Sequence, residues 1–313
     1  FNDTMNVLMY AVWLVPTEEY ANGIMNPAGY QEAGLVGAII IVVSLLAFSL
    51  GLRRFIPQLR SYRIDAPISP HQFFRQVADV FRTASARIVV LAGVLYYAGV
   101  GTYVALWAYI YSYFWEFTSE QISFIVIPMA VAALFLPPAI ARWGVRHEKK
   151  TMAIIGLLGG MVINVIPISL RLLGFFPENG STVLFWIMLM AGFFETMLLL
   201  LFDISWRSMI ADLTEQTELK TGRRNEGVIS STIAFTSKCS DALGTLIAGT
   251  LLTLIAFPTE TAIGEVPESV ITKLGLVYGP MIFLIWMGVI LTISRYRISR
   301  LQHEKMLERL SKK

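Results

Sequence analysis

The sequence is poor in charge and almost devoid of cysteine. Only 15% of its 313 residues are charged and 55% are hydrophobic, whereas an ordinary soluble protein carries about 25% charged residues. Cys239 is the only cysteine, which excludes a disulfide framework, a thiol metal site and a paired-cysteine redox motif. His71, His147 and His303 are far apart in the sequence, and none is expected to ligate a metal. The deficit of charge predicts an all-α polytopic membrane protein.

Motifs for covalent chemistry are also missing. The chain contains no phosphate-binding P-loop, no HExxH helix and no GxSxG elbow. We therefore expect no enzymatic activity and no cofactor. The net charge of +3 does not point to nucleic acid in so apolar a chain. The expected partners are the lipid bilayer and a small-molecule substrate.

Apolar runs long enough to cross a bilayer account for most of the chain. One span is predicted at 33–52, and six more at 88–114, 121–140, 151–174, 181–210, 228–257 and 274–295. Residues 53–87 are polar and basic, and the stretch 71–87 is typical of an interfacial amphipathic helix. Residues 4–15 are apolar but too short to span from the start of the chain, which suggests the tail of an interrupted helix.

The connections between the predicted spans alternate in charge. One set is rich in glutamate, whereas the other is rich in lysine and arginine and includes residues 141–151, the cluster at 212–226 and the tail at 295–313. The positive-inside rule places the basic set, and with it the C-terminus, in the cytoplasm. The chain is thus expected to cross a cell membrane, such as a bacterial inner membrane, several times.

The stretch 202–245 carries the most specific pattern. It combines Ala211, Asp212, Leu213, Glu215, Glu218, Thr221, Arg223, Arg224, Glu226 and Gly227 with a lysine, Lys238, twelve residues after that last glutamate. This pattern resembles the glycoside–pentoside–hexuronide:cation symporters, the melibiose-permease-like members of the major facilitator superfamily. The resemblance extends over nearly the whole chain.

The resemblance implies a fold and a function. Residues 1–52 would be the end of the N-terminal half, with part of helix 5 and all of helix 6. Residues 53–87 would link the two halves, and residues 88–297 would form helices 7 to 12. Residues 298–313 would be a cytoplasmic tail. Helices 1 to 4 and most of helix 5 are then missing, so a fragment is expected. The implied activity is cation-coupled symport of a sugar or glycoside by alternating access, in a protein that is monomeric at full length. The coupling ion, sodium or proton, would be bound mostly by the missing half.

Ionisable and aromatic residues inside the spans are the candidate substrate and coupling residues, because charge in a membrane is costly. Lys238 lies near the middle of its span, and Asp241 is close enough to pair with it. Asp203 and Arg207 are spaced for an ion pair, and Glu195 lies two turns earlier. Three aromatic residues could face a sugar: Tyr103, Trp107 and Trp206. Structural ion pairs and helix packing are the alternatives for all of these.

The charged cluster predicts a cytoplasmic gate. Asp212, Glu215 and Glu218 would form ion pairs with Arg223 and Arg224 that break when the gate opens; a solvated loop is the alternative. Arg142 and Arg146 resemble the basic positions of a facilitator loop, although Ala141 replaces its usual aspartate.

Two other functions stay open. One is transport of lysophospholipids or other amphiphiles by the same fold, since relatives retain the same lysine. The other is a membrane receptor or scaffold that has lost transport. The substrate and the choice between sodium and proton do not follow from the sequence.

Overall fold

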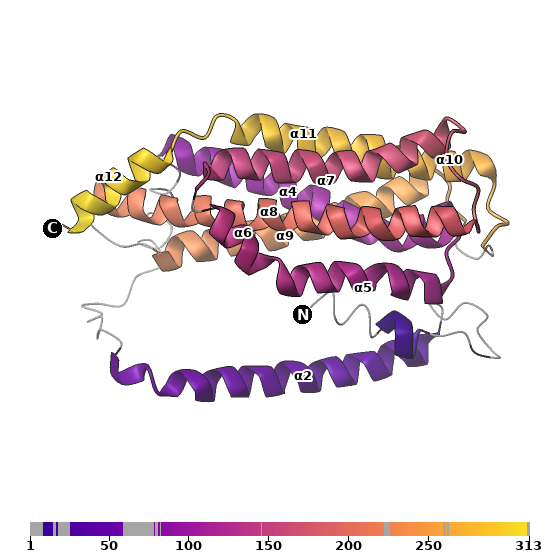
Figure 1. Cartoon of the computed structure of the whole chain (residues 1–313), viewed down its shortest axis with the longest axis horizontal. Coiled ribbons are helices and arrows are strands. Elements are labelled where there is room, and N and C mark those ends of the chain that lie inside the picture. The colour runs from indigo at the N-terminus through magenta and orange to yellow at the C-terminus, as the bar shows by residue number, and fades with distance from the viewer. Residues whose placement is uncertain are drawn as a thin grey trace.

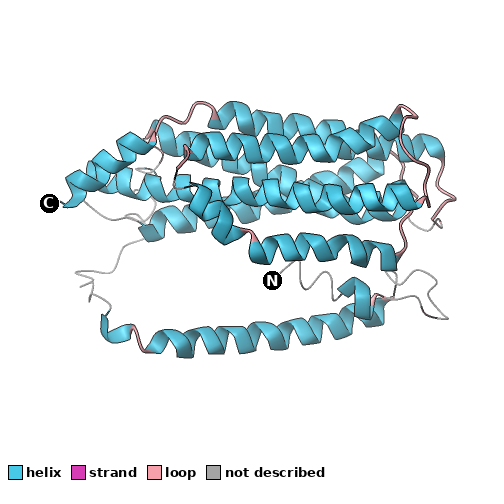
Figure 2. Cartoon of the chain, viewed as in Figure 1, coloured by secondary structure: helices cyan, strands magenta, loops and turns pink. Residues whose placement is uncertain are grey.

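The structure is a bundle of long helices. The computed structural model describes residues 9–14, 17, 26–58, 78, 81, 83–144, 146–221, 226–258, 261 and 263–311, and it contains no strand within them. Figure 1 shows the bundle and Figure 2 its helical content. In chain order the elements are η1 (Met9–Trp13), α2 (Pro27–Arg53), η3 (Ile56–Gln58), α4 (Ala84–Tyr109), η4 (Ile110–Phe114), α5 (Ser119–Phe135), α6 (Pro137–Gly144), α7 (Lys149–Leu172), α8 (Thr182–Thr221), α9 (Glu226–Leu254), α10 (Glu268–Leu276), η5 (Val277–Met281), α11 (Ile282–Ile293) and α12 (Arg300–Ser311).

The predicted all-α membrane fold is confirmed. Five helical segments are long and apolar enough to cross a bilayer, and the pair α5 and α6, bent by 48°, makes a sixth. Helix α9 has the required length but is too polar to be counted with them. Side-chain caps begin several spans: Asn26 caps α2, Thr83 caps α4, and Thr118 forms a capping box with Gln121 on α5.

Two boundaries differ from the sequence prediction. Helix α8 does not end near residue 210 but continues to Thr221, so the acidic residues Asp212, Glu215 and Glu218 lie on a helix. The predicted tail contains α12, which packs against α8. Both differences have one cause, because the end of α8 buries Asp212 and Leu213 to 2% and 1% exposure. Contacts with other helices therefore stabilise this segment.

Helix α2 stands apart from the other helices (Figure 1). It packs mainly against η1, and its buried positions are the small residues Gly29, Ala33 and Gly37. Leu35, Phe48 and other large apolar side chains are exposed, as expected for a helix surrounded by lipid or by further helices. Most of the predicted linker at 53–87, and most of the amphipathic stretch 71–87, lies outside the described residues, while 84–87 already belong to α4.

The closest helix pair is α4 and α9. A Cβ on Gly244 would overlap the Ala98 carbonyl oxygen, and a Cβ on Gly101 would overlap the Asp241 carbonyl oxygen. The Thr102 hydroxyl donates a hydrogen bond of 3.0 Å to the Gly244 carbonyl. Small residues that let two backbones meet, joined by a hydroxyl hydrogen bond, are typical of helix packing in membranes. This contact fixes α9, and therefore Lys238, against α4.

Candidate functional site

Lys238 lies near the middle of α9 and is exposed. Asp241 is half-buried, and its backbone and carboxylate pack against Gly101 of α4. Within the described residues no ion pair joins Lys238 to Asp241, although their spacing permitted one. The ammonium of Lys238 is therefore not neutralised by its own helix in this arrangement.

The exposed surface of α9 is divided between two kinds of side chain. Phe235 and Leu246 are 73% and 66% exposed and are apolar. Small and polar residues follow another stripe at helical spacing, which we call the Lys238 stripe: Ser231, Ala234, Lys238, Ala242, Thr245 and Gly249, all exposed. Helix α9 thus presents one face suited to lipid and another suited to water or to a second helix.

The ion pair expected on α8 forms. Arg207 donates through Nε to Asp203 Oδ2 at 2.7 Å, with the Arg207 side chain 71% exposed and that of Asp203 32% exposed. Trp206 lies on the buried side of the helix instead. Its ring is 1% exposed, packs next to Gly93 and stacks on Phe202 with 6.0 Å between centroids. In this arrangement Trp206 is a packing residue, and its contact with a sugar remains a prediction.

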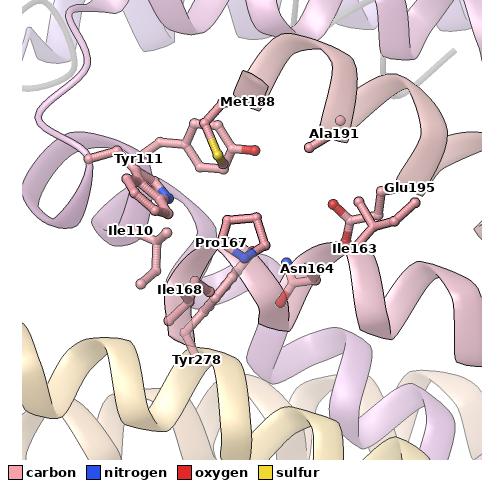
Figure 3. A pocket seen from close by; sticks show the side chains of 12 residues that line it. Ile110, Tyr111, Ile163, Asn164, Pro167, Ile168, Met188, Ala191, Glu195 and Tyr278 are labelled. Carbon is pink, nitrogen blue, oxygen red and sulfur yellow. The ribbon is translucent and has the colours of Figure 1, made fainter. Parts of the chain in front are cut away.

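Glu195 also points away from the exposed surface, into the bundle. The residue is 5% exposed, and the Tyr103 hydroxyl donates to its Oε1 at 3.0 Å. Asn164 of α7 lies beside the carboxylate (Figure 3). The predicted coupling residue Glu195 and the predicted sugar contact Tyr103 thus belong to one buried polar group. Trp107 is half-buried and stacks on Tyr111 with 4.2 Å between centroids.

The carboxylate of Glu195 borders a small cavity with room for about one water molecule. Asn164, Tyr278 and Tyr111 are its other polar neighbours, and the remaining walls are mostly apolar: Ile110, Ile163, Ile168 and Met188 (Figure 3). The Tyr278 hydroxyl is buried and lacks a hydrogen bond of good geometry. Sequence reasoning missed Asn164 and Tyr278, although an amide in the otherwise apolar run 151–170 and a tyrosine before Gly279 and Pro280 were visible signals.

A second polar group lies at the end of the bundle where α8 finishes and α12 packs. We call it the charged-end cluster: Lys149, Asp212, Glu215, Tyr296 and His303. Lys149 Nζ lies 2.6 Å from Asp212 Oδ1, and His303 Nε2 lies 2.6 Å from Glu215 Oε2 and 3.5 Å from Asp212 Oδ1. The Tyr296 hydroxyl donates to Asp212 Oδ2 at 3.4 Å. Burial, with the nearby Asp212 carboxylate, raises the pKa of Tyr296, so its hydroxyl remains a donor.

The charged-end cluster differs from the predicted gate in its partners. The acidic residues contact Lys149 of α7 and His303 of α12, which the sequence pattern did not indicate, while Arg223 and Arg224 lie outside the described residues. Glu218, Arg142 and Arg146 form no ion pair within the described part of the chain, and both arginines are exposed.

The spacing of Asp212, Glu215 and His303 would suit a metal ion, since their ligating atoms lie within 4.8 Å of one another. However, the Lys149 ammonium contacts the same Asp212 oxygen and already supplies positive charge. The arrangement is therefore that of an ion-pair network.

Comparison with protein families matches residues 4–300 to the family described as MFS/sugar transport protein. No curated protein matches the chain. The family match spans every helix of the bundle from η1 to α11 and extends to the first residue of α12.

Proposed function

The chain belongs to the MFS/sugar transport protein family, and from that premise we propose that it carries a sugar or glycoside across the membrane by cation-coupled symport. A transporter of the major facilitator type moves a small molecule through a site between membrane helices. The finer assignment, to the melibiose-permease-like symporters, rests on the pattern from Ala211 to Lys238.

The observation that carries the proposal is the exposed charge on α8 and α9. A lysine at the centre of a bilayer costs about 2.5–3.5 kcal/mol on insertion scales, so Lys238 is not expected to face lipid tails. The Lys238 stripe, together with the exposed Asp203–Arg207 pair, instead suits a water-filled passage. Charged and hydroxyl groups in such a passage can hydrogen-bond the hydroxyls of a sugar.

The charged-end cluster supports an orientation. The basic connections of the sequence gather where α8 ends and α12 packs, so the positive-inside rule favours the cytoplasm for this end. Contacts from α7 and α12 to Asp212 and Glu215 would then close the cytoplasmic mouth, and they would have to change when it opens.

The test is Lys238→Met in the reconstituted protein, measured as uptake of labelled sugars and glycosides driven by a cation gradient. The substitution keeps the side-chain length and removes the charge, and we expect uptake to fall by about tenfold or more. Lys238→Arg should rescue poorly, because a planar fork does not replace a compact ammonium. Lys273→Met is the matched control, since Lys273 is an exposed lysine on α10, outside the Lys238 stripe.

Wild-type uptake in Lys238→Met at equal expression would remove Lys238 from the coupled site. Uptake of lysophospholipids, without uptake of any sugar or glycoside, would contradict the proposed substrate class but would still agree with a transport function. Absence of uptake for every solute in the wild-type protein would contradict transport itself and favour a receptor or scaffold.

A further inference from the structure

We infer that Glu195 is the proton-binding site of the coupled transport, held inside the bundle by Tyr103 and Asn164 at a cavity that Tyr278 also lines. The inference rests on the proposed function and specifies its coupling ion. It also adds a site to the expectation from the family resemblance, which assigned the coupling ion mostly to carboxylates outside this chain.

The first support is the isolation of the carboxylate. In the described part of the chain, Glu195 is the only charged residue that borders the cavity, and no described lysine, arginine or histidine forms an ion pair with it. An ionised carboxylate without a partner cation is unstable in an apolar interior, where a buried carboxyl group neutralises by taking up a proton. Binding and release of one proton make and break only the carboxyl O–H bond.

The second support is the hydroxyl of Tyr278, which is 1% exposed, lines the same cavity beside Tyr103 and Asn164, and within the described residues lacks a hydrogen bond of good geometry. A buried polar group without a partner costs about 1–3 kcal/mol, so a ligand or water between Tyr278 and Glu195 is favoured. A tyrosine hydroxyl both donates and accepts. Through a water molecule in the cavity, Tyr278 can therefore donate toward the ionised carboxylate or accept from the protonated acid.

The third support is the helix irregularity around the cavity. Ile110 and Tyr111 belong to the π-helical turn η4, and Tyr278 belongs to the π-helical turn η5. Pro167 lies within α7 at the cavity wall, next to Asn164 in Figure 3. Turns of π-helix occur frequently at functional sites and mark places where a helix can bend. The cavity thus lies where α4, α7 and the α10–α11 helix can change shape.

The groups that face Glu195 identify the ion. Its titratable neighbours are three tyrosines: Tyr103 of α4, Tyr111 of η4 and Tyr278 of η5. Helix α7 contributes the neutral amide of Asn164. From α5, the apolar side chains of Ile125 and Met129 pack nearby against Gly192. A sodium ion needs several oxygens converging on one point, whereas Ile110, Ile163 and Ile168 fill part of this cavity wall. A proton needs only the carboxylate and one hydrogen-bond partner.

The test is Glu195→Gln in the reconstituted protein, with two transport assays. Exchange of labelled for unlabelled substrate needs no net proton movement and should remain close to wild type, whereas accumulation driven by a pH gradient should fall by about tenfold or more. Tyr278→Phe keeps the ring and removes the hydroxyl, so it should also reduce accumulation more than exchange. Glu268→Gln, an exposed carboxyl at the start of α10, is the matched control.

A readout independent of transport is the infrared carbonyl band of a protonated carboxyl group during a pH titration of the purified protein. Above the pH at which exposed carboxyl groups have ionised, we expect such a band to remain in the wild type and in Glu268→Gln and to be missing in Glu195→Gln. The inference is overturned if the band persists in Glu195→Gln, if pH-driven accumulation persists, or if only a sodium gradient drives wild-type accumulation. Loss of exchange in the wild-type protein would instead contradict the proposed function.

Discussion

The contact between α4 and α9 makes a quantitative prediction, because two glycines of α9 lie in opposite surroundings. A Cβ added to Gly244 would overlap the Ala98 carbonyl oxygen and would lie 2.8 Å from the Thr102 nitrogen, and both are backbone atoms that cannot rotate away. A Cβ added to Gly249, five residues later on the same helix, would meet nothing within 4 Å. Gly244→Ala and Gly249→Ala are therefore a matched pair.

The magnitude follows from three contributions. Overpacking a well-filled contact costs about 1–3 kcal/mol. Displacing α9 would also weaken the hydrogen bond from Thr102 to the Gly244 carbonyl, worth about 0.6 kcal/mol on average in membranes. The helix propensity of alanine favours both variants by about 0.8–1.0 kcal/mol and cancels in the comparison. Gly244→Ala should thus be less stable than Gly249→Ala by about 1.5–3.5 kcal/mol.

The free energy of unfolding can be measured by titration with sodium dodecyl sulfate in mixed micelles, followed by circular dichroism. Gly249→Ala should be as stable as the wild type or more stable, and Gly244→Ala less stable. Equal stability of the two variants would refute the close approach of α4 and α9. It would also remove the argument that α4 fixes the position of Lys238.

Two further predictions concern the charged-end cluster. Lys149→Met leaves the Asp212 carboxylate, 2% exposed, without the Lys149 ammonium. Because Lys149 itself is partly solvated, we expect the free energy of unfolding to fall by roughly 3 kcal/mol, the lower end for breaking a buried pair. Lys305→Met, at an exposed lysine, is the control. Adding Asp212→Asn should recover part of that loss, and strictly additive effects in this double-mutant cycle would show that the two residues are not coupled. His303→Ala removes the contacts of α12 with Asp212 and Glu215, so limited proteolysis of the tail should become faster than in Lys305→Ala, a change at an exposed residue of the same helix. Equal cleavage rates would contradict docking through His303.

The sequence was sufficient to predict the helical membrane fold because bilayer thickness imposes a strong and local constraint on composition. The ion pair between Asp203 and Arg207 was predictable for the same kind of reason, since both residues lie on one helix four positions apart. It was harder to predict from the sequence which residues of a helix face the interior and which face the exposed surface. Trp206 and Arg207 are neighbours in sequence, yet one is buried and the other exposed.

Contacts between distant segments were not predictable from local spacing. The partners of Asp212 come from α7 and α12, and the acidic run was compatible with nearby Arg223 and Arg224 as well. The length of α8 was missed for a related reason: its charged end is stabilised by these contacts, whereas charge density alone favoured a solvated loop. The group around Glu195 draws on four separate helical segments, which no sequence spacing reveals.

The two polar systems proposed for transport share their helices, and this arrangement gives a physical route for coupling. Glu195 and Asp203 lie on α8 about 12 Å apart along its axis, but Glu195 faces the interior and Asp203 the exposed surface. Helix α4 likewise contributes Tyr103 to Glu195 and Gly101 to the packing of α9. In the proposed mechanism, a substrate that moves α8 or α4 at the exposed face would also change the contact of Tyr103 with Glu195. Because the hydrogen bond that Tyr103 donates stabilises the ionised carboxylate, a movement that changes this bond would change the affinity of Glu195 for a proton, and by linkage the proton would change the affinity for substrate.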